Sequence, residues 1–213
     1  MIASFRWLRC GLLPCGWLIG LLLALCVYPA AAEPYKGRLF DGHLHYSHQA
    51  WDVLDAKAAM QLLDDAEVHG ALTSSTPDEG TQRLLAEKHP RVRIVPLYRP
   101  YTPEAGSGSW YKRPTHLDGA EAAMEAALHH GLGEVHIHAP VILETARIRK
   151  LVQRVADLGL FIQPHSDFQV VEKIFEVAPR AKVVWAHAGF SDPPAVIGRL
   201  MDKHANLWAD LSY

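Results

Sequence analysis

Two histidines, His43 and His45, are separated by one residue in the segment FDGHLH at residues 40–45. Side chains alternate across a β-strand, so residues at positions i and i+2 point to the same side. Histidine is the commonest metal ligand in proteins. If this segment is a strand, both imidazole rings can therefore reach one divalent ion.

Two more histidines stand where strands are expected to end. His165 closes a predicted strand at residues 160–165, and His187 closes another at residues 182–187. A single histidine at such a position could be a hydrogen-bonded core or surface residue. Four histidines at strand ends, two of them in H-x-H spacing, favour a metal site instead. Nitrogen and oxygen ligands suit a divalent ion such as zinc.

Cysteine cannot supply ligands to such a site. The sequence has 3 cysteines, and they are Cys10, Cys15 and Cys26. Disulfides and cysteine-type zinc sites are therefore excluded from the rest of the chain. Any metal held there must be bound by histidine, aspartate or glutamate.

Predicted strands and helices alternate strictly from residue 38 onward. The predicted strands cover residues 38–45, 71–75, 92–98, 134–138, 160–165, 182–187 and 207–211. The predicted helices cover residues 53–69, 78–88, 117–130, 148–158, 168–177 and 193–204. This alternation indicates βαβ units and parallel strands. No glycine-rich phosphate loop follows a predicted strand, which favours a barrel and leaves a doubly wound open sheet as the alternative.

The expected fold class is therefore α/β, with a TIM (β/α)8-type barrel that is incomplete. A closed barrel of this type has eight strands and typically about 250 residues. The 213 residues supply about seven predicted strands, so the eighth is missing and a C-terminal truncation is expected. The first and seventh strands would then be unpaired sheet edges.

Composition and charge limit the classes of partner. Hydrophobic residues make up 49% of the chain and charged residues 21%, which is typical of a globular protein. The formal net charge of −2 provides no whole-chain positive field for nucleic acid. The expected partner is a small-molecule substrate, and an oligomer is possible.

The N-terminal residues resemble a secretory signal. Arg6 and Arg9 precede an almost wholly apolar run at residues 11–28, and small residues follow at 30–32. This pattern predicts a signal peptide at residues 1–32, a mature domain at residues 33–213, and a periplasmic or secreted protein without stable membrane association after cleavage. A membrane anchor and a lipoprotein at Cys26 are the alternatives.

Three segments together resemble a known enzyme superfamily. They are LFDGHLH at residues 39–45, WAHAGF at 185–190 and LWADLS at 207–212. With the ordered histidines, they resemble the amidohydrolase superfamily, most closely the exported bacterial members of its amidohydrolase-related (amidohydrolase 2) branch of metal-dependent hydrolases. The resemblance spans residues 39–213.

The resemblance implies a set of site residues. His43, His45, His165 and His187 would bind or face one or two divalent ions, with zinc the expected metal. His165 and His187 would also be catalytic, because either could stabilise the developing oxyanion. The superfamily places its metal-binding and general-base aspartate at the end of strand eight, which nothing here matches. Asp210 falls on the seventh predicted strand and is not assigned that role, so the chain as given is expected to have little or no activity.

Glu134 is a further candidate metal ligand. It shares one face of the predicted fourth strand with His136 and His138. Its place resembles that of the glutamate that bridges two metals in TatD-type hydrolases. Glu134 could bridge a second ion, accept a hydrogen bond from a metal-binding histidine, or belong to a polar layer inside the barrel.

Candidate substrate-binding residues are Arg99, His136 and Trp110. Arg99 follows the third predicted strand and could clamp a carboxylate bidentately, or it could be a solvated loop residue. His136 is a pocket candidate from its position on strand four. Trp110, in the loop at residues 99–114, could wall a pocket or simply pack on the barrel.

These features predict a metal-dependent hydrolase that directs water at an ester, lactone, amide or similar bond of a small molecule. One alternative is a metal-dependent, non-oxidative decarboxylase of the same branch, in which Arg99 would hold the carboxylate. The other is a non-catalytic periplasmic protein that binds a metal or another ligand.

Overall fold

Strands and helices alternate along residues 35–102 and 105–212, the parts of the chain that the computed structural model describes. The strands are β1 (Leu39–Leu44), β2 (Val68–Thr73), β3 (Arg93–Pro96), β4 (Gly131–His136), β5 (Phe161–His165), β6 (Lys182–Trp185) and β7 (Leu207–Ala209). The helices are α2 (Ala56–Asp65), α3 (Glu79–Ala86), α4 (Pro114–Glu125), α5 (Ala146–Asp157), α6 (Phe168–Val177) and α7 (Pro194–Lys203). Short 3-10 helices lie at η1 (His48–Ala50), η2 (Trp110–Lys112) and η3 (Pro140–Glu144).

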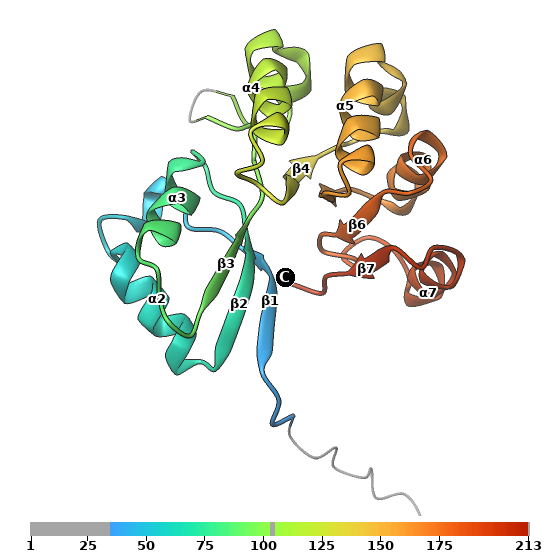
Figure 1. Cartoon of the computed structure of the whole chain (residues 1–213). Coiled ribbons are helices and arrows are strands. Elements are labelled where there is room, and N and C mark those ends of the chain that lie inside the picture. Colours follow the sequence, from blue (N-terminus) through green and yellow to red (C-terminus); the bar gives the residue numbers. More distant parts are fainter. Residues whose placement is uncertain (1–34, 103–104, 213) are drawn as a thin grey trace, which may run out of the picture. The chain divides into compact units, whose positions relative to one another are not determined.

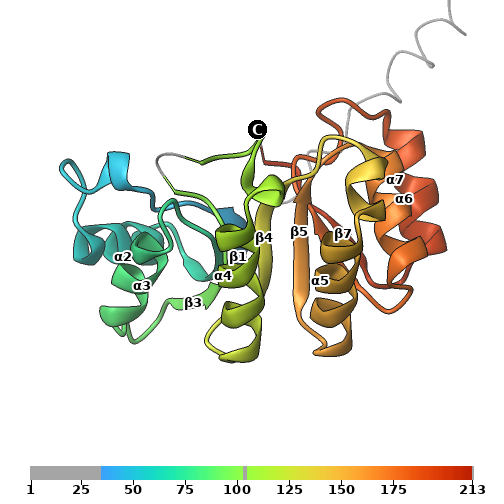
Figure 2. The same cartoon turned by 90° about the horizontal axis from the view of Figure 1, so that it is seen from above.

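The strands are parallel and follow one another in sequence order. One sheet has the order β1-β2-β3 and the other β4-β5-β6-β7. Tyr98 joins them, since its N–H donates to the Gly131 carbonyl at 2.8 Å and its carbonyl accepts from Gly133 N–H at 2.9 Å. Helices lie outside the strands (Figures 1 and 2). Sequential order differs from a doubly wound sheet, in which the strand order reverses.

The predicted α/β class is confirmed, with an arrangement that fits an incomplete barrel. Among residues 35–102 and 105–212, no strand pairing joins β7 to β1. Both strands are therefore sheet edges, as the sequence predicted. A side-chain hydrogen bond connects the two ends instead: His43 Nδ1 on β1 donates to Oδ2 of Asp210, the residue after β7, at 2.5 Å.

Most element boundaries differ from the predicted ones by a few residues, and two of the differences have a clear physical reason. The predicted helix at residues 53–69 is shorter, because the Asp55 side chain caps its start and the chain turns at Glu67, where φ is 58°. Gly131 begins β4 and does not end the preceding helix. A Cβ at this position would lie 2.3 Å from the Phe161 carbonyl oxygen, so glycine permits the close approach of β4 to β5.

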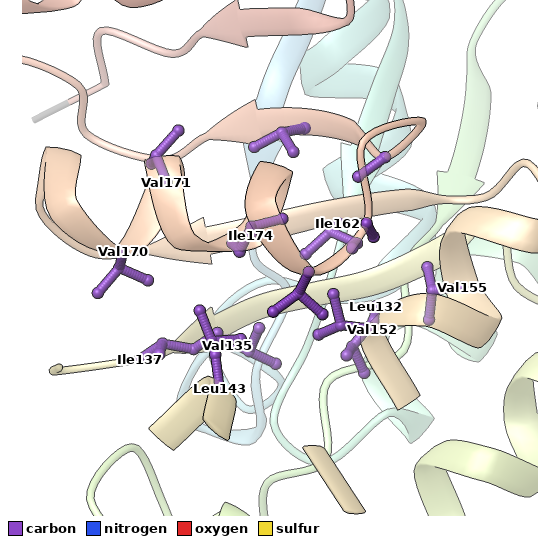
Figure 3. Close-up of a cluster of buried hydrophobic side chains, with 14 of the residues drawn as sticks. Leu132, Val135, Ile137, Leu143, Val152, Val155, Ile162, Val170, Val171 and Ile174 are labelled. Carbon is purple, nitrogen blue, oxygen red and sulfur yellow. The ribbon is translucent and has the colours of Figure 1, made fainter. Parts of the chain in front are cut away.

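The largest hydrophobic core lies between the strands β4–β7 and the helices α4–α7, and Figure 3 shows buried side chains of this cluster. Leu132 and Ile162 project from the strands, and Val152 and Ile174 from the helices, each with at most 1% of its surface exposed. This packing anchors the strands whose carboxyl ends carry Glu134 and His165.

We expect Ile162→Ala to lower the free energy of unfolding by about 2 to 5 kcal/mol, because it leaves a cavity in a fully buried site. Val53→Ala is the control, since Val53 is 85% exposed and its truncation should cost less than about 0.5 kcal/mol. Urea denaturation followed by circular dichroism measures both. Equal, small effects in the two variants would contradict the described core.

The predicted signal peptide at residues 1–32 lies outside the described residues. Among residues 35–102 and 105–212, no helix combines the length and the apolar character that a bilayer span requires.

Candidate metal centre

Four imidazole rings surround one carboxylate at the carboxyl ends of the strands. His43 lies on β1 and His45 directly follows it, while His165 ends β5 and His187 follows β6 by two residues. The carboxylate is that of Glu134 on β4, which is only 2% exposed. The structure thus brings together all five residues that the sequence predicted as metal ligands.

The two oxygens of Glu134 face different pairs of histidines. Oε2 lies 3.2 Å from His45 Nε2 and 3.6 Å from His43 Nε2. Oε1 lies 2.5 Å from His165 Nδ1 and 3.4 Å from His187 Nε2. Glu134 therefore stands between two sets of three donor atoms, and the atoms of each set lie within 4.8 Å of one another.

Hydrogen bonds on the far side of three rings set the direction of their lone pairs. His45 Nδ1 donates to the Ser74 carbonyl. His187 Nδ1 donates to the Ser212 carbonyl at 2.9 Å, and His43 Nδ1 donates to Asp210 Oδ2 at 2.5 Å. Because Nδ1 carries the proton in each case, a neutral ring directs the lone pair of Nε2 toward Glu134.

Two of these lone pairs face each other. The Nε2 atoms of His43 and His45 are 3.0 Å apart, and both point at a carboxylate oxygen. Three acceptors so close together require a cation or a proton between them. This donor set fits a divalent metal ion, and a carbonyl or carboxylate behind each metal-binding histidine is the usual supporting arrangement.

Without a metal, protons take this place. Burial alone would lower the pKa of His43, but hydrogen bonds to Asp210 and Glu134 outweigh burial and raise it from 6.5 to about 9. Burial alone would raise the pKa of Glu134, but hydrogen bonds from His165, His43 and His45 hold it well below its usual range. Burial alone would also raise the pKa of Asp210, but the hydrogen bond from His43 outweighs burial and lowers this pKa to about 2.

The titration of His43 predicts how metal-free stability depends on pH. The folded chain keeps the His43 proton up to about pH 9, while the unfolded chain loses it near pH 6.5. The stabilisation is therefore complete below pH 6.5 and is lost as pH rises through 9, an effect of about 2 to 3 kcal/mol.

Urea denaturation in EDTA at pH 6 and at pH 9.5 tests this expectation. The pH-dependent loss of stability should be smaller in His43→Gln than in wild type, and unchanged in His48→Gln, which removes an exposed histidine. Equal losses in wild type and His43→Gln would contradict the raised pKa of His43.

The backbone at His187 is in the left-handed region, with φ of 54°. Few non-glycine residues adopt this conformation, and where it occurs the surrounding structure must hold it. Here Phe190 N–H donates to the His187 carbonyl at 3.0 Å, and Ala188 N–H donates to the Asp210 carbonyl at 2.8 Å. This turn directs the His187 ring toward Glu134.

Arg99, predicted as a substrate clamp, lies against Glu134. Its terminal nitrogen donates to Glu134 Oε2 at 2.8 Å, and its Nε donates to the Glu134 carbonyl at 3.2 Å. The guanidinium also lies over the ring of Tyr101, 4.7 Å from its centroid. In this arrangement it balances the charge of the buried glutamate.

His136 and Trp110, the other predicted substrate contacts, pack behind the site. His136 stacks on His165 with ring centroids 4.0 Å apart. Burial lowers the pKa of His136 to about 4, so its ring is neutral at neutral pH. Trp110 is 1% exposed and donates from Nε1 to the His136 carbonyl at 2.9 Å, which places it in the core.

Asp210 is the site residue that sequence reasoning left out. It directly follows β7, and its carboxylate holds His43 at 2.5 Å. Its place just after a parallel strand, like those of His45 and His187, was the available signal. The resemblance does not assign Asp210, because the superfamily pattern places its aspartate on strand eight.

A cavity of about 240 Å³ opens beside His165 and His187. Polar side chains line much of it, among them His138, Ser166 and Ser191. The rings of His165 and His187 are 38% and 23% exposed, so a small molecule in this space can reach them.

Comparison with known proteins finds likeness in structure. No protein-family model matches the sequence, and no curated protein matches it significantly. The apo crystal structure of IDCase from Metarhizium anisopliae is similar over 78% of this chain and 69% of that chain, with a TM-score of 0.50 and 11% identity. This chain shares its α/β fold with that protein.

A second solved structure is described as a probable 2-pyrone-4,6-dicarboxylic acid hydrolase from Acinetobacter baumannii with citric acid bound. It is similar over 83% of this chain and 70% of that chain, with a TM-score of 0.49 and 14% identity. Identities this low establish no common activity, so the function must be argued from the site.

Proposed function

We propose that this protein is a metal-dependent hydrolase of the amidohydrolase type, in which Glu134 and the four histidines would hold two divalent ions. The observation that carries the proposal is the convergence of four imidazole nitrogens on the two oxygens of that carboxylate. Their mixed nitrogen and oxygen chemistry favours zinc.

The number of donors favours a catalytic over a structural ion site. His43, His45 and Glu134 form one set, and Glu134, His165 and His187 form the other. Structural zinc sites are usually closed by four protein ligands, whereas catalytic sites have three and leave a position open. Two donor sets of three, next to a polar cavity, match the second pattern.

A bound divalent ion supplies an acidified water molecule and polarises the bond to be cleaved. The protein's own residues fix the geometry. Asp210 and the Ser74 carbonyl orient the rings of His43 and His45. His165 and His187 border the cavity. Because Nδ1 of His165 faces Glu134, its Nε2 is the ring nitrogen that can stabilise the oxygen that becomes negative, while His187 would hold the ion.

The small cavity and its polar walls favour a compact polar substrate with an ester, lactone or amide bond. In this proposal the predicted signal peptide delivers the enzyme to the periplasm or the medium, where it acts on small molecules. Mass spectrometry of the N-terminus of protein recovered from a bacterial host tests the cleavage after residue 32.

Metal analysis is the first test of the function. Protein stripped with chelator and dialysed against zinc should hold two equivalents, and His43→Ala and His187→Ala should each lose at least one. His69→Ala, which changes a histidine on β2, is the matched control and should keep both. Unchanged metal content in the first two variants would overturn the proposed site.

Turnover is the second test. Zinc-loaded protein is incubated with panels of esters, lactones, amides and aromatic carboxylic acids, and products and carbon dioxide are measured. A hydrolytic product that disappears on chelation supports the proposal. Carbon dioxide without a hydrolytic product would replace it with the decarboxylase.

A further inference from the structure

His136 is held at three of its atoms by two aromatic residues of the segment after β3. The Tyr101 hydroxyl accepts from the His136 backbone N–H at 2.7 Å and donates to His136 Nδ1 at 3.0 Å. Trp110 Nε1 donates to the His136 carbonyl at 2.9 Å. Both aromatic residues are buried, with 6% and 1% of their surfaces exposed, so these bonds are shielded from water.

His165 lacks the kind of support that the other three histidines have. Its Nδ1 faces Glu134 at 2.5 Å, and its Nε2 makes no hydrogen bond to a residue in the described part of the chain. The ring of His136 lies against it instead, with centroids 4.0 Å apart and planes inclined by 21°. This stacking limits rotation of a ring that is otherwise 38% exposed.

We propose that Tyr101 and Trp110 are positioning residues: they fix His136 against His165, and His136 in turn fixes the direction in which His165 presents Nδ1 to Glu134. This inference rests on the proposed function, because it concerns the ion position formed by Glu134, His165 and His187. His136 is then a backing residue of the site and makes no contact with the substrate.

Tyr101→Phe is the sharpest test, because it removes the hydroxyl and keeps the ring that lies under Arg99. The metal-free protein is titrated with Co²⁺, and binding is followed by visible absorption. The band that His165→Ala removes belongs to the ion position formed by Glu134, His165 and His187, so the two ion positions can be followed separately. The affinity of the His165 position should fall about 10- to 100-fold, the range typical for loss of a supporting partner, while the His43 position is unchanged.

Tyr111→Phe is the matched control. Tyr111 lies in the same segment and contacts Trp110 edge-on at 5.9 Å, but its hydroxyl makes no hydrogen bond within residues 35–102 and 105–212. It should leave both affinities unchanged. A purely structural role of Tyr101 would lower the melting temperature without separating the two positions, and that result would overturn the proposal.

A metal-free measurement keeps this inference separable from the proposed function. NMR of ring nitrogens in stripped protein should show His136 protonated at Nε2, with the His165 ring signals shifted by the stack. Tyr101→Phe is expected to shift the ring signals of both His136 and His165. If Tyr101→Phe does not fold, Trp110→Phe is measured in its place with the same expected result. Unchanged His165 signals would overturn the inference even if wild type binds two ions, and wild type without metal binding would overturn the proposed function alone.

Discussion

Glu134→Gln protein is expected to bind no divalent metal at concentrations that fill the wild type. The substitution keeps the size of the side chain but removes the only charge that both sets of donor atoms share. The amide nitrogen of glutamine would also point a donor at one imidazole pair. Metal-dependent turnover should fall by at least about 100-fold, which is typical when a group that stabilises transition-state charge is lost.

The same substitution should destabilise the metal-free protein. Arg99 is 12% exposed and donates to Glu134 Oε2, so it would remain as a largely buried charge without its partner. Removing one member of a buried ion pair costs about 3 to 5 kcal/mol. Urea denaturation in EDTA at pH 6 measures this cost.

Glu144→Gln is the control, because Glu144 is 57% exposed and its ion pair with Lys173 lies at the surface. Surface ion pairs contribute about 0 to 1 kcal/mol. A Glu134→Gln protein that still binds two equivalents of zinc with wild-type affinity would show that the carboxylate is not a ligand.

Asp210→Asn should weaken metal binding at the His43 position by about 10- to 100-fold. The carboxylate accepts the Nδ1 proton of His43 and so directs the opposite nitrogen toward Glu134. An asparagine can present its amide nitrogen instead, which would favour the other tautomer of the ring. Isothermal titration with zinc measures the change, and Asp202→Asn, which alters an exposed carboxylate on α7, is its control.

Loss of Asp210 should also bring the pKa of His43 down from about 9, because one of the two carboxylates that raise it is gone. NMR titration of the metal-free variant reads this directly. Wild-type zinc affinity together with a lowered pKa would mean that Asp210 affects the proton on His43 without orienting the ring for metal.

The gathering of the five predicted metal ligands at one place could be predicted from the sequence because local rules place them. Strand alternation sets His43 and His45 on one face, and the strand ends locate His165 and His187. The parallel order of the strands then brings these ends to one edge. Strand alternation also put Glu134 on one face of the fourth strand, and its resemblance to the bridging glutamate of TatD-type hydrolases made it a candidate ligand.

Other parts of the site depend on contacts that no local pattern encodes. Arg99 and Trp110 lie in a loop, and a loop sequence does not reveal which residues its side chains contact. The loop turns both inward, to Glu134 and to the His136 carbonyl. Asp210 was not assigned to the site because the superfamily pattern places its aspartate on strand eight, and the sequence does not reveal that the residues after β7 approach β1.

Two of the four histidines take their supporting hydrogen bonds from the three residues that follow β7. Asp210 serves His43, and Ser212 serves His187. Each donor set therefore depends on the same short stretch of backbone, which also bonds to itself from Ser212 N–H to Asp210 Oδ1. An ion that binds more tightly when these rings are oriented also stabilises the hydrogen bonds from residues 210–212 that orient them. By thermodynamic linkage, the two effects have the same free energy. If the site holds an ion, its binding is therefore expected to be coupled to the hydrogen bonds that join residues 210–212 to His43 and His187.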